Sequence, residues 1–190
     1  MPEGRSLPGR TRREAISLVA ILAIILFWSG SLLADTLDSA RFFNATFGDF
    51  SEELKNAKSE GKQGVLLMFE MDECPFCHRM KGTVLNRPEV QDYFKANFLI
   101  FPVDVEGDVE ITDFAGSSTT QKDFALKSHR VRATPVFAFF DLDGNLVTKY
   151  IGATRDADEF MLLGRYVVEG HYKNAPFQQF KREHRKVAGQ

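Results

Sequence analysis

CPFCHRM, residues 74–80, contains the only two cysteines in the 190-residue chain. Cys74 and Cys77 have the spacing of a redox-active C-x-x-C pair. With His78, the same stretch also matches C-x-x-C-H, the pattern that attaches a c-type haem. A disulfide that closes so short a loop constrains the unfolded chain little, so a purely structural bridge is a weak explanation. The sequence on either side of the heptapeptide has to decide between redox and haem chemistry.

The segments that flank the cysteines predict a strand followed directly by a helix. Val65–Phe69, VLLMF, is a short apolar run bounded by turn residues, which is typical of a buried strand. Pro75 suits the first position of a helix, where the missing N–H has no intrahelical partner to lose. This helix is expected to continue to about Leu85, so the cysteine pair lies at its start.

The rest of the chain alternates between apolar runs and amphipathic segments, whereas residues 35–50 show no clear period and are expected to be a lead-in. The first expected elements are a helix capped by Asp49 or Ser51 to about residue 60, a strand over 65–69, helices over 75–85 and from Pro88, and a strand over 98–105. A polar insertion over 106–121 with a small hairpin, a helix from Gln121 to near His129, a two-stranded hairpin over 132–152 and a helix over 156–168 are expected to follow. The order β-α-β-α-β-β-α predicts an α/β layer fold.

The N-terminal segment has the pattern of an export signal. Four arginines precede the apolar run Leu18–Trp28, and the small residues that follow end at Ala34. A basic start, roughly 7–15 apolar residues and a small residue are typical of a secretory signal peptide. Residues 1–34 are therefore expected to be either a signal cleaved after Ala34 or a retained membrane anchor. Both alternatives place the cysteines outside the cytoplasm, in the periplasm or beyond, because basic residues stay inside.

The charge balance of the exported part argues against a nucleic-acid partner. Beyond residue 34 the chain has 20 basic and 24 acidic side chains, a net charge of −4. The composition, with 44% hydrophobic and 26% charged residues, is that of a globular domain. The last stretch, 171–190, is expected to be a basic C-terminal tail, most simply a solvated one.

Taken together, these features resemble the thioredoxin family over residues 35–170. The resemblance rests on the strand that leads into CPFC, on Thr134-Pro135 in ATPVFAFFD, and on the hairpin DLDGNLVTKYIG that ends in Gly152. It implies a thioredoxin fold, a central mixed sheet flanked by helices, with a small polar insertion before the helix that precedes the proline. Within that family the chain looks most like exported thioredoxin-like proteins of the SoxW kind, which are linked to sulfur oxidation.

The resemblance also assigns roles to residues. It implies that Cys74 is the nucleophile, at a helix start where the backbone N–H groups and the helix dipole favour a thiolate. Cys77 then resolves the mixed disulfide. Thr134 and Pro135, with a cis peptide bond between them, are implied to lie beside Cys74, where a substrate segment can pair as an added strand.

The chain departs from the thioredoxin pattern close to the cysteines. Met68 stands where many thioredoxins have a buried Asp, and Glu73 replaces the usual Trp before the pair. Glu70 is a candidate for the proton-relay role, although solvated acids at a strand end explain it more simply. His78 is a candidate for tuning the thiolate, because a nearby positive charge stabilises it.

Other chemistries fit the chain less well. A haem needs a helical cavity and usually a distal Met or His; Met80 is too close to His78, and Met161 is better explained as a core residue of its helix. Structural zinc needs about four ligands, and the chain has two Cys and four scattered His. No cofactor or metal is expected. A docking protein that binds partners through the proline groove without turnover remains an alternative.

The segment lengths favour one direction of disulfide chemistry. Pro135 follows Cys77 by 58 positions, which leaves no room for the inserted helical domain of the dedicated exported oxidases. Residues 35–50 are too short for the dimerisation domain of the disulfide isomerases. We therefore expect a monomeric reductase of disulfide-containing proteins. Its implied partner is a membrane-linked electron donor.

Overall fold

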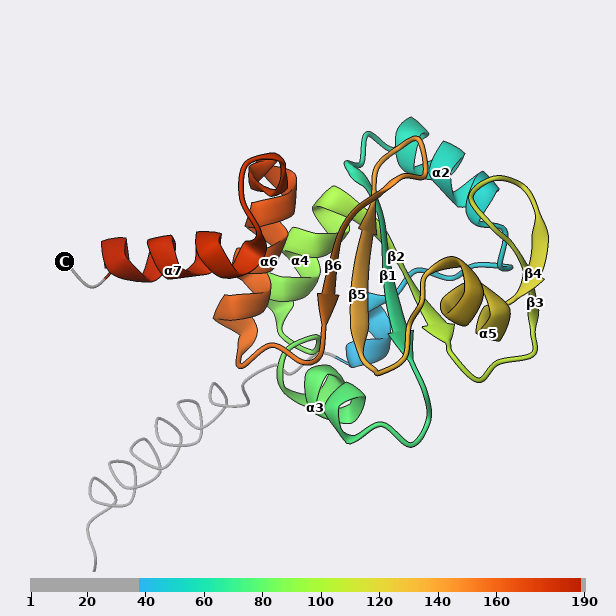
Figure 1. Ribbon diagram of the computed structural model, residues 1–190, viewed down its shortest axis with the longest axis horizontal. Helices are drawn as coiled ribbons and strands as arrows, with labels where there is room; N and C mark the ends of the chain where they lie inside the picture. Colours follow the sequence, from blue (N-terminus) through green and yellow to red (C-terminus); the bar gives the residue numbers. More distant parts are fainter. Residues whose placement is uncertain (1–37, 189–190) are drawn as a thin grey trace, which may run out of the picture. The chain divides into compact units, whose positions relative to one another are not determined.

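The computed structural model describes residues 38–188 (Figure 1). The expected signal peptide or anchor, residues 1–34, lies outside this range. Among the described residues, no helix combines the length and apolar character that crossing a membrane requires.

A four-stranded mixed sheet forms the centre of the domain. Its strands are β1 (Gly64–Glu70), β2 (Phe98–Asp104), β5 (Val136–Phe140) and β6 (Leu146–Ile151), in the order β2-β1-β5-β6. β1 pairs in parallel with β2 and antiparallel with β5, and β6 is antiparallel to β5. The expected mixed α/β architecture is confirmed, and β1 lies in the middle of the sheet, so its apolar run is buried on both faces.

Helices cover both faces of the sheet (Figure 1). α3 (Pro75–Thr83), α4 (Pro88–Asn97) and α6 (Ala157–Val168) pack on one face. α2 (Phe50–Ser59) and the α5 turn (Gln121–Asp123), which continues as the π-helix η2 (Phe124–Ser128), pack on the other. Asp49 caps α2, as expected, by accepting a hydrogen bond from the Glu52 N–H at 3.0 Å.

The expected polar insertion is a hairpin that is anchored in the core. Its strands are β3 (Glu110–Thr112) and β4 (Ser118–Thr120). Phe114, in the connection between them, packs against the rings of Phe50, Phe124 and Phe140.

The lead-in contributes more to the core than its sequence indicates. Ser39–Phe42 forms the 3-10 turn η1, and the Phe42 side chain is fully buried. Its ring lies 5.9 Å from that of Phe94 and 6.1 Å from that of Phe160. One helical turn is too short to show a hydrophobic period, so this contact is not visible in the sequence.

Part of the expected C-terminal tail is folded against the domain. It forms the 3-10 turn η3 (His171–Lys173) and helix α7 (Phe177–Ala188). Phe177 and Phe180 are buried, and both rings pack on Tyr166 of α6. Phe177 and Phe180, three positions apart, lie on one face of the basic helix α7 and pack it against α6. The domain therefore extends beyond residue 170.

His129 is expected to make the fold sensitive to acid. Its ring packs against Phe69, Phe124 and Phe140. Burial, helped by the charge of Lys149, lowers its pKa from 6.5 to about 4. Because the unfolded chain binds this proton first, stability should fall as the pH drops from about 6.5 to 4, with no further loss from this group below that.

Replacing this histidine tests the effect. In His129→Leu, the part of the acid destabilisation that falls between pH 6.5 and 4 should disappear, as measured by urea unfolding at pH 7, 5 and 4. The same change at the exposed His184 should leave the pH dependence of the wild-type chain in place. Parallel pH profiles for His129→Leu and the wild type would contradict the prediction.

Candidate redox site

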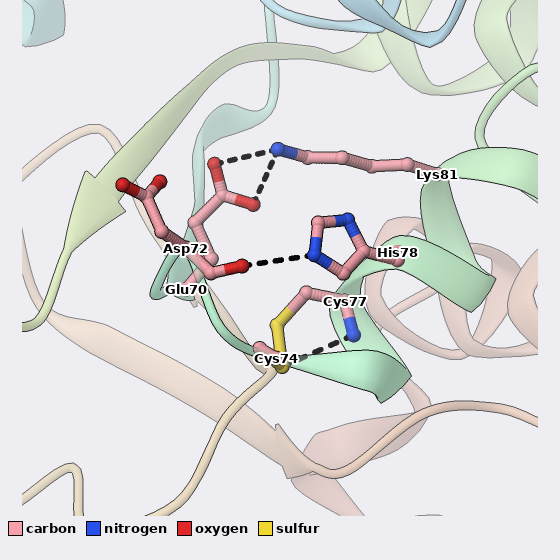
Figure 2. Close-up of a disulfide and its surroundings, with 6 residues drawn as sticks. All are labelled: Glu70, Asp72, Cys74, Cys77, His78 and Lys81. Atoms are coloured by element: carbon pink, nitrogen blue, oxygen red, sulfur yellow. Dashed lines mark hydrogen bonds and ion pairs between the residues drawn. A yellow bond between two sulfur atoms is a disulfide. The ribbon is translucent and has the colours of Figure 1, made fainter.

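The two cysteines form a disulfide at the start of α3 (Figure 2). Their Cα atoms are 5.2 Å apart. Cys74 is the N-cap of the helix, with extended backbone angles (φ −119°, ψ 97°), and its sulfur accepts a hydrogen bond from the Cys77 N–H at 3.1 Å. The expected N-cap position of Cys74 is confirmed. This N–H and the positive end of the helix dipole would stabilise a thiolate at Cys74 once the disulfide is reduced.

Capping, and not exposure, distinguishes the two sulfurs in this oxidised state. Cys74 is 4% and Cys77 2% exposed, so both are buried. Between them, Pro75 occupies the first helical turn, as expected, and the side chain of Phe76 is 60% exposed. The loop of the disulfide therefore carries an exposed aromatic side chain.

The Thr134–Pro135 peptide bond is cis, as expected. Pro135 directly precedes β5, whose first residue, Val136, is paired with Phe69 of β1. β1 leads into the cysteine loop from this same end of the sheet. The topology therefore brings Pro135 and the cysteine loop to the same end of the sheet. Direct contact between Pro135 and Cys74 stays a prediction.

Glu70 lies at the end of β1 and pairs with a lysine that the sequence analysis did not single out. The Lys81 ammonium lies 2.7 Å from Glu70 Oε2 and 2.9 Å from Oε1 (Figure 2). Glu70 is therefore not a solvated acid. Lys81 follows Cys77 by four residues, which is one helical turn, and that spacing was the available signal.

His78 is exposed and turns back toward the loop before the disulfide. Its Nε2 lies 2.8 Å from the backbone carbonyl oxygen of Asp72 (Figure 2). A hydrogen bond here requires the proton on Nε2, because a carbonyl oxygen only accepts. His78 thus fastens the cysteine loop to α3, and any tuning of the Cys74 thiolate by it stays a prediction.

Arg79 is engaged away from the sulfurs. Its guanidinium donates hydrogen bonds to the carbonyl oxygens of Thr154 at 2.7 Å and Arg155 at 3.2 Å. Both residues belong to the loop between β6 and α6. No sequence pattern links positions 79 and 154, so this contact could not be predicted.

Within residues 38–188, no group of three or more His, Cys, Asp and Glu side chains is placed to hold a metal ion. A disulfide at a helix N-terminus, a cis-proline at the same end of the sheet and a mixed four-stranded sheet together define the thioredoxin class of fold and site.

Comparison with known proteins assigns the family. Residues 50–167 match the model of the thioredoxin-like domain family, and the chain belongs to that family. A search of curated proteins gave no match. The family assignment favours a redox pair, and not haem attachment, as the interpretation of CPFCHRM.

Solved structures agree with this assignment. A thioredoxin-fold protein from Helicobacter pylori superposes with a TM-score of 0.60 at 18% identity, over 80% of this chain and 95% of that one, and shows the fold alone. A thioredoxin from Thermus thermophilus is 27% identical, with a TM-score of 0.50 over 63% of this chain and 84% of that one. A putative disulphide isomerase from Bacteroides thetaiotaomicron is 25% identical, with a TM-score of 0.51 over 67% and 95%.

Proposed function

We propose that this protein is an exported thiol–disulfide oxidoreductase that reduces disulfide bonds in other proteins. The observation that carries the proposal is the Cys74–Cys77 disulfide at the N-terminus of α3 in a thioredoxin-like domain. The likeness to a thioredoxin and to a putative disulphide isomerase supports the same class of reaction.

The reaction consists of two exchanges. The Cys74 thiolate of the reduced protein attacks one sulfur of a substrate disulfide, forming a mixed disulfide and expelling one substrate thiolate. The Cys77 thiolate then attacks the Cys74 sulfur, which forms the intramolecular disulfide and expels the second substrate thiolate. Two electrons pass to the substrate, and the two expelled thiolates take up protons. A dithiol donor, which we propose to be membrane-linked, returns the pair to its reduced state.

The surroundings of the cysteines supply the remaining roles. Thr134 and Pro135, just before β5, offer backbone against which an extended substrate segment pairs. The exposed Phe76 packs against the apolar side chains of that substrate segment. Glu70, held by Lys81, is proposed to accept the proton that the Cys77 thiol loses before it attacks.

The proposed exported location rests on the sequence of residues 1–34, and the proposed link to sulfur oxidation rests on the likeness to exported thioredoxin-like proteins of the SoxW kind. A reporter fused after Gln190 should be active outside the cytoplasm. Activity that is confined to the cytoplasm would refute the location and leave the redox chemistry untouched.

Insulin reduction tests the enzymatic part. With dithiothreitol as the donor, catalytic amounts of the wild-type domain should accelerate the precipitation of the insulin B chain over dithiothreitol alone. A rate equal to that of dithiothreitol alone would contradict a reductase and would favour a protein that docks partners without turnover.

A further inference from the structure

The loop Gly152–Asp156 connects β6 with α6 and borders the proposed substrate site. The Gly152 N–H donates a hydrogen bond to the carbonyl oxygen of Pro135 at 2.8 Å. Any displacement of this loop therefore acts on the backbone against which the substrate segment is proposed to pair.

The redox helix holds this loop from one side. Arg79 of α3 binds the carbonyl oxygens of Thr154 and Arg155 through two hydrogen bonds. Thr154 itself is fully buried, and its hydroxyl donates to the carbonyl oxygen of Asp156 at 3.0 Å. The loop is thus fastened to the helix that carries both cysteines.

Glu159 of α6 holds the same loop from the other side. Its Oε2 accepts the N–H of Arg155 at 3.3 Å. Its own N–H donates to Asp156, the N-cap of α6, at 2.9 Å, which completes a form of capping box. Arg155 is therefore bound at its carbonyl oxygen by α3 and at its N–H by α6.

The Glu159 side chain depends on a partner from the C-terminal helix. Only 6% of it is exposed, and a buried carboxylate is costly unless it is paired. Lys181 of α7 supplies the pair at 2.6 Å, and the Tyr150 hydroxyl lies 3.3 Å from the same oxygen. Burial raises the pKa of Glu159, but the hydrogen bond and charge of Lys181 outweigh it and hold the pKa below its ordinary value.

We propose that Arg79 on one side, and Lys181 acting through Glu159 on the other, position the Gly152–Asp156 loop for binding protein substrates. The C-terminal helix is then a support of the substrate site, although it lies outside the cysteine motif. This inference rests on the proposed function, since it assigns positioning residues to that same site. None of these side chains takes part in the exchange of sulfur bonds.

Lys181→Met separates binding from chemistry, because methionine is unbranched like lysine but lacks the ammonium group that pairs with Glu159 and lies 5.8 Å from the centre of the Phe177 ring. The KM for insulin should rise about five-fold or more, whereas kcat should stay within about two-fold. The rate with 5,5′-dithiobis(2-nitrobenzoate), a small disulfide that needs no groove, should also stay within about two-fold. Lys181→Arg should restore the wild-type KM, because arginine can make the same pair.

Two further variants complete the test. Lys127→Met removes a lysine from an exposed ion pair with Asp123 on the other face of the sheet and should change no parameter. Arg79→Met releases the loop without changing α7, so it should also raise the KM for insulin. If Lys181→Met does not unfold cooperatively, Arg79→Met alone tests whether the position of the loop controls substrate binding. An unchanged KM in either folded variant overturns the inference. Failure of the wild-type chain to reduce insulin overturns the proposed function instead.

Discussion

Cys77→Ser is expected to trap a mixed disulfide between Cys74 and a substrate protein. Cys74 caps α3, so its thiolate is stabilised and attacks, but the second sulfur that would release the substrate is missing. Multiple turnover in the insulin assay should fall by at least roughly 10³-fold. The covalent adduct should be visible by non-reducing electrophoresis and intact mass, and should disappear with dithiothreitol.

Cys74→Ser is the matched control. It leaves one buried thiol at position 77, which lies within the first turn of α3 and does not cap the helix. Both turnover and trapping should be lost. Adduct formation through Cys77 at the rate seen for the Cys77→Ser variant would show that the roles of the two sulfurs are assigned wrongly.

Phe160→Ala should cause the largest loss of stability in the domain, about 3–5 kcal/mol. The Phe160 side chain is fully buried where α6 meets the sheet. Its ring stacks on Phe94 at 4.4 Å and also contacts Phe137 at 4.8 Å and Phe42 at 6.1 Å. Truncation leaves a cavity among rings that belong to three other elements, so the surroundings cannot easily collapse into it. Urea unfolding at pH 7 measures the loss.

Phe47→Ala provides the comparison within the same residue type. Phe47 is fully exposed, so its removal should change the free energy of unfolding by less than about 0.5 kcal/mol. A loss below about 1 kcal/mol for Phe160→Ala would mean that the core does not close around α6 as described.

The parts of the fold that the sequence predicts are those governed by local rules. Val65–Phe69 is a continuous apolar run because β1 is central in the sheet and buried on both faces. Pro75 marks the start of α3, and Asp49 marks the start of α2. The first N–H groups of a helix have no intrahelical partner, so a proline loses no hydrogen bond there and an aspartate side chain can accept one. The cysteine pair could be located from its spacing, and the cis-proline from the resemblance to the thioredoxin family.

The contacts that escaped prediction join positions far apart in the chain or within very short elements. Arg79 reaches the loop at Thr154, and Lys181 reaches Glu159, across separations that carry no periodic signal. Phe42 enters the core from a single 3-10 turn. Residues 171–190 resemble a tail in the sequence because their many charges outweigh two phenylalanines in any average of hydropathy over the segment.

The export of the domain depends on residues 1–34, and the link to sulfur oxidation depends on the likeness to proteins of the SoxW kind. Neither changes what the cysteine pair can do chemically, because the disulfide and its helix lie within residues 38–188.

The reduction potential of the Cys74–Cys77 pair, measured by equilibration with glutathione buffers, tests directly whether the protein reduces disulfides or oxidises thiols. A reductase of protein disulfides should titrate as a single two-electron couple with a potential below about −220 mV, in the range of thioredoxins and glutaredoxins. A potential near about −120 mV would identify an oxidant of thiols. A bridge that stays closed even in excess dithiothreitol would contradict a redox role for the pair.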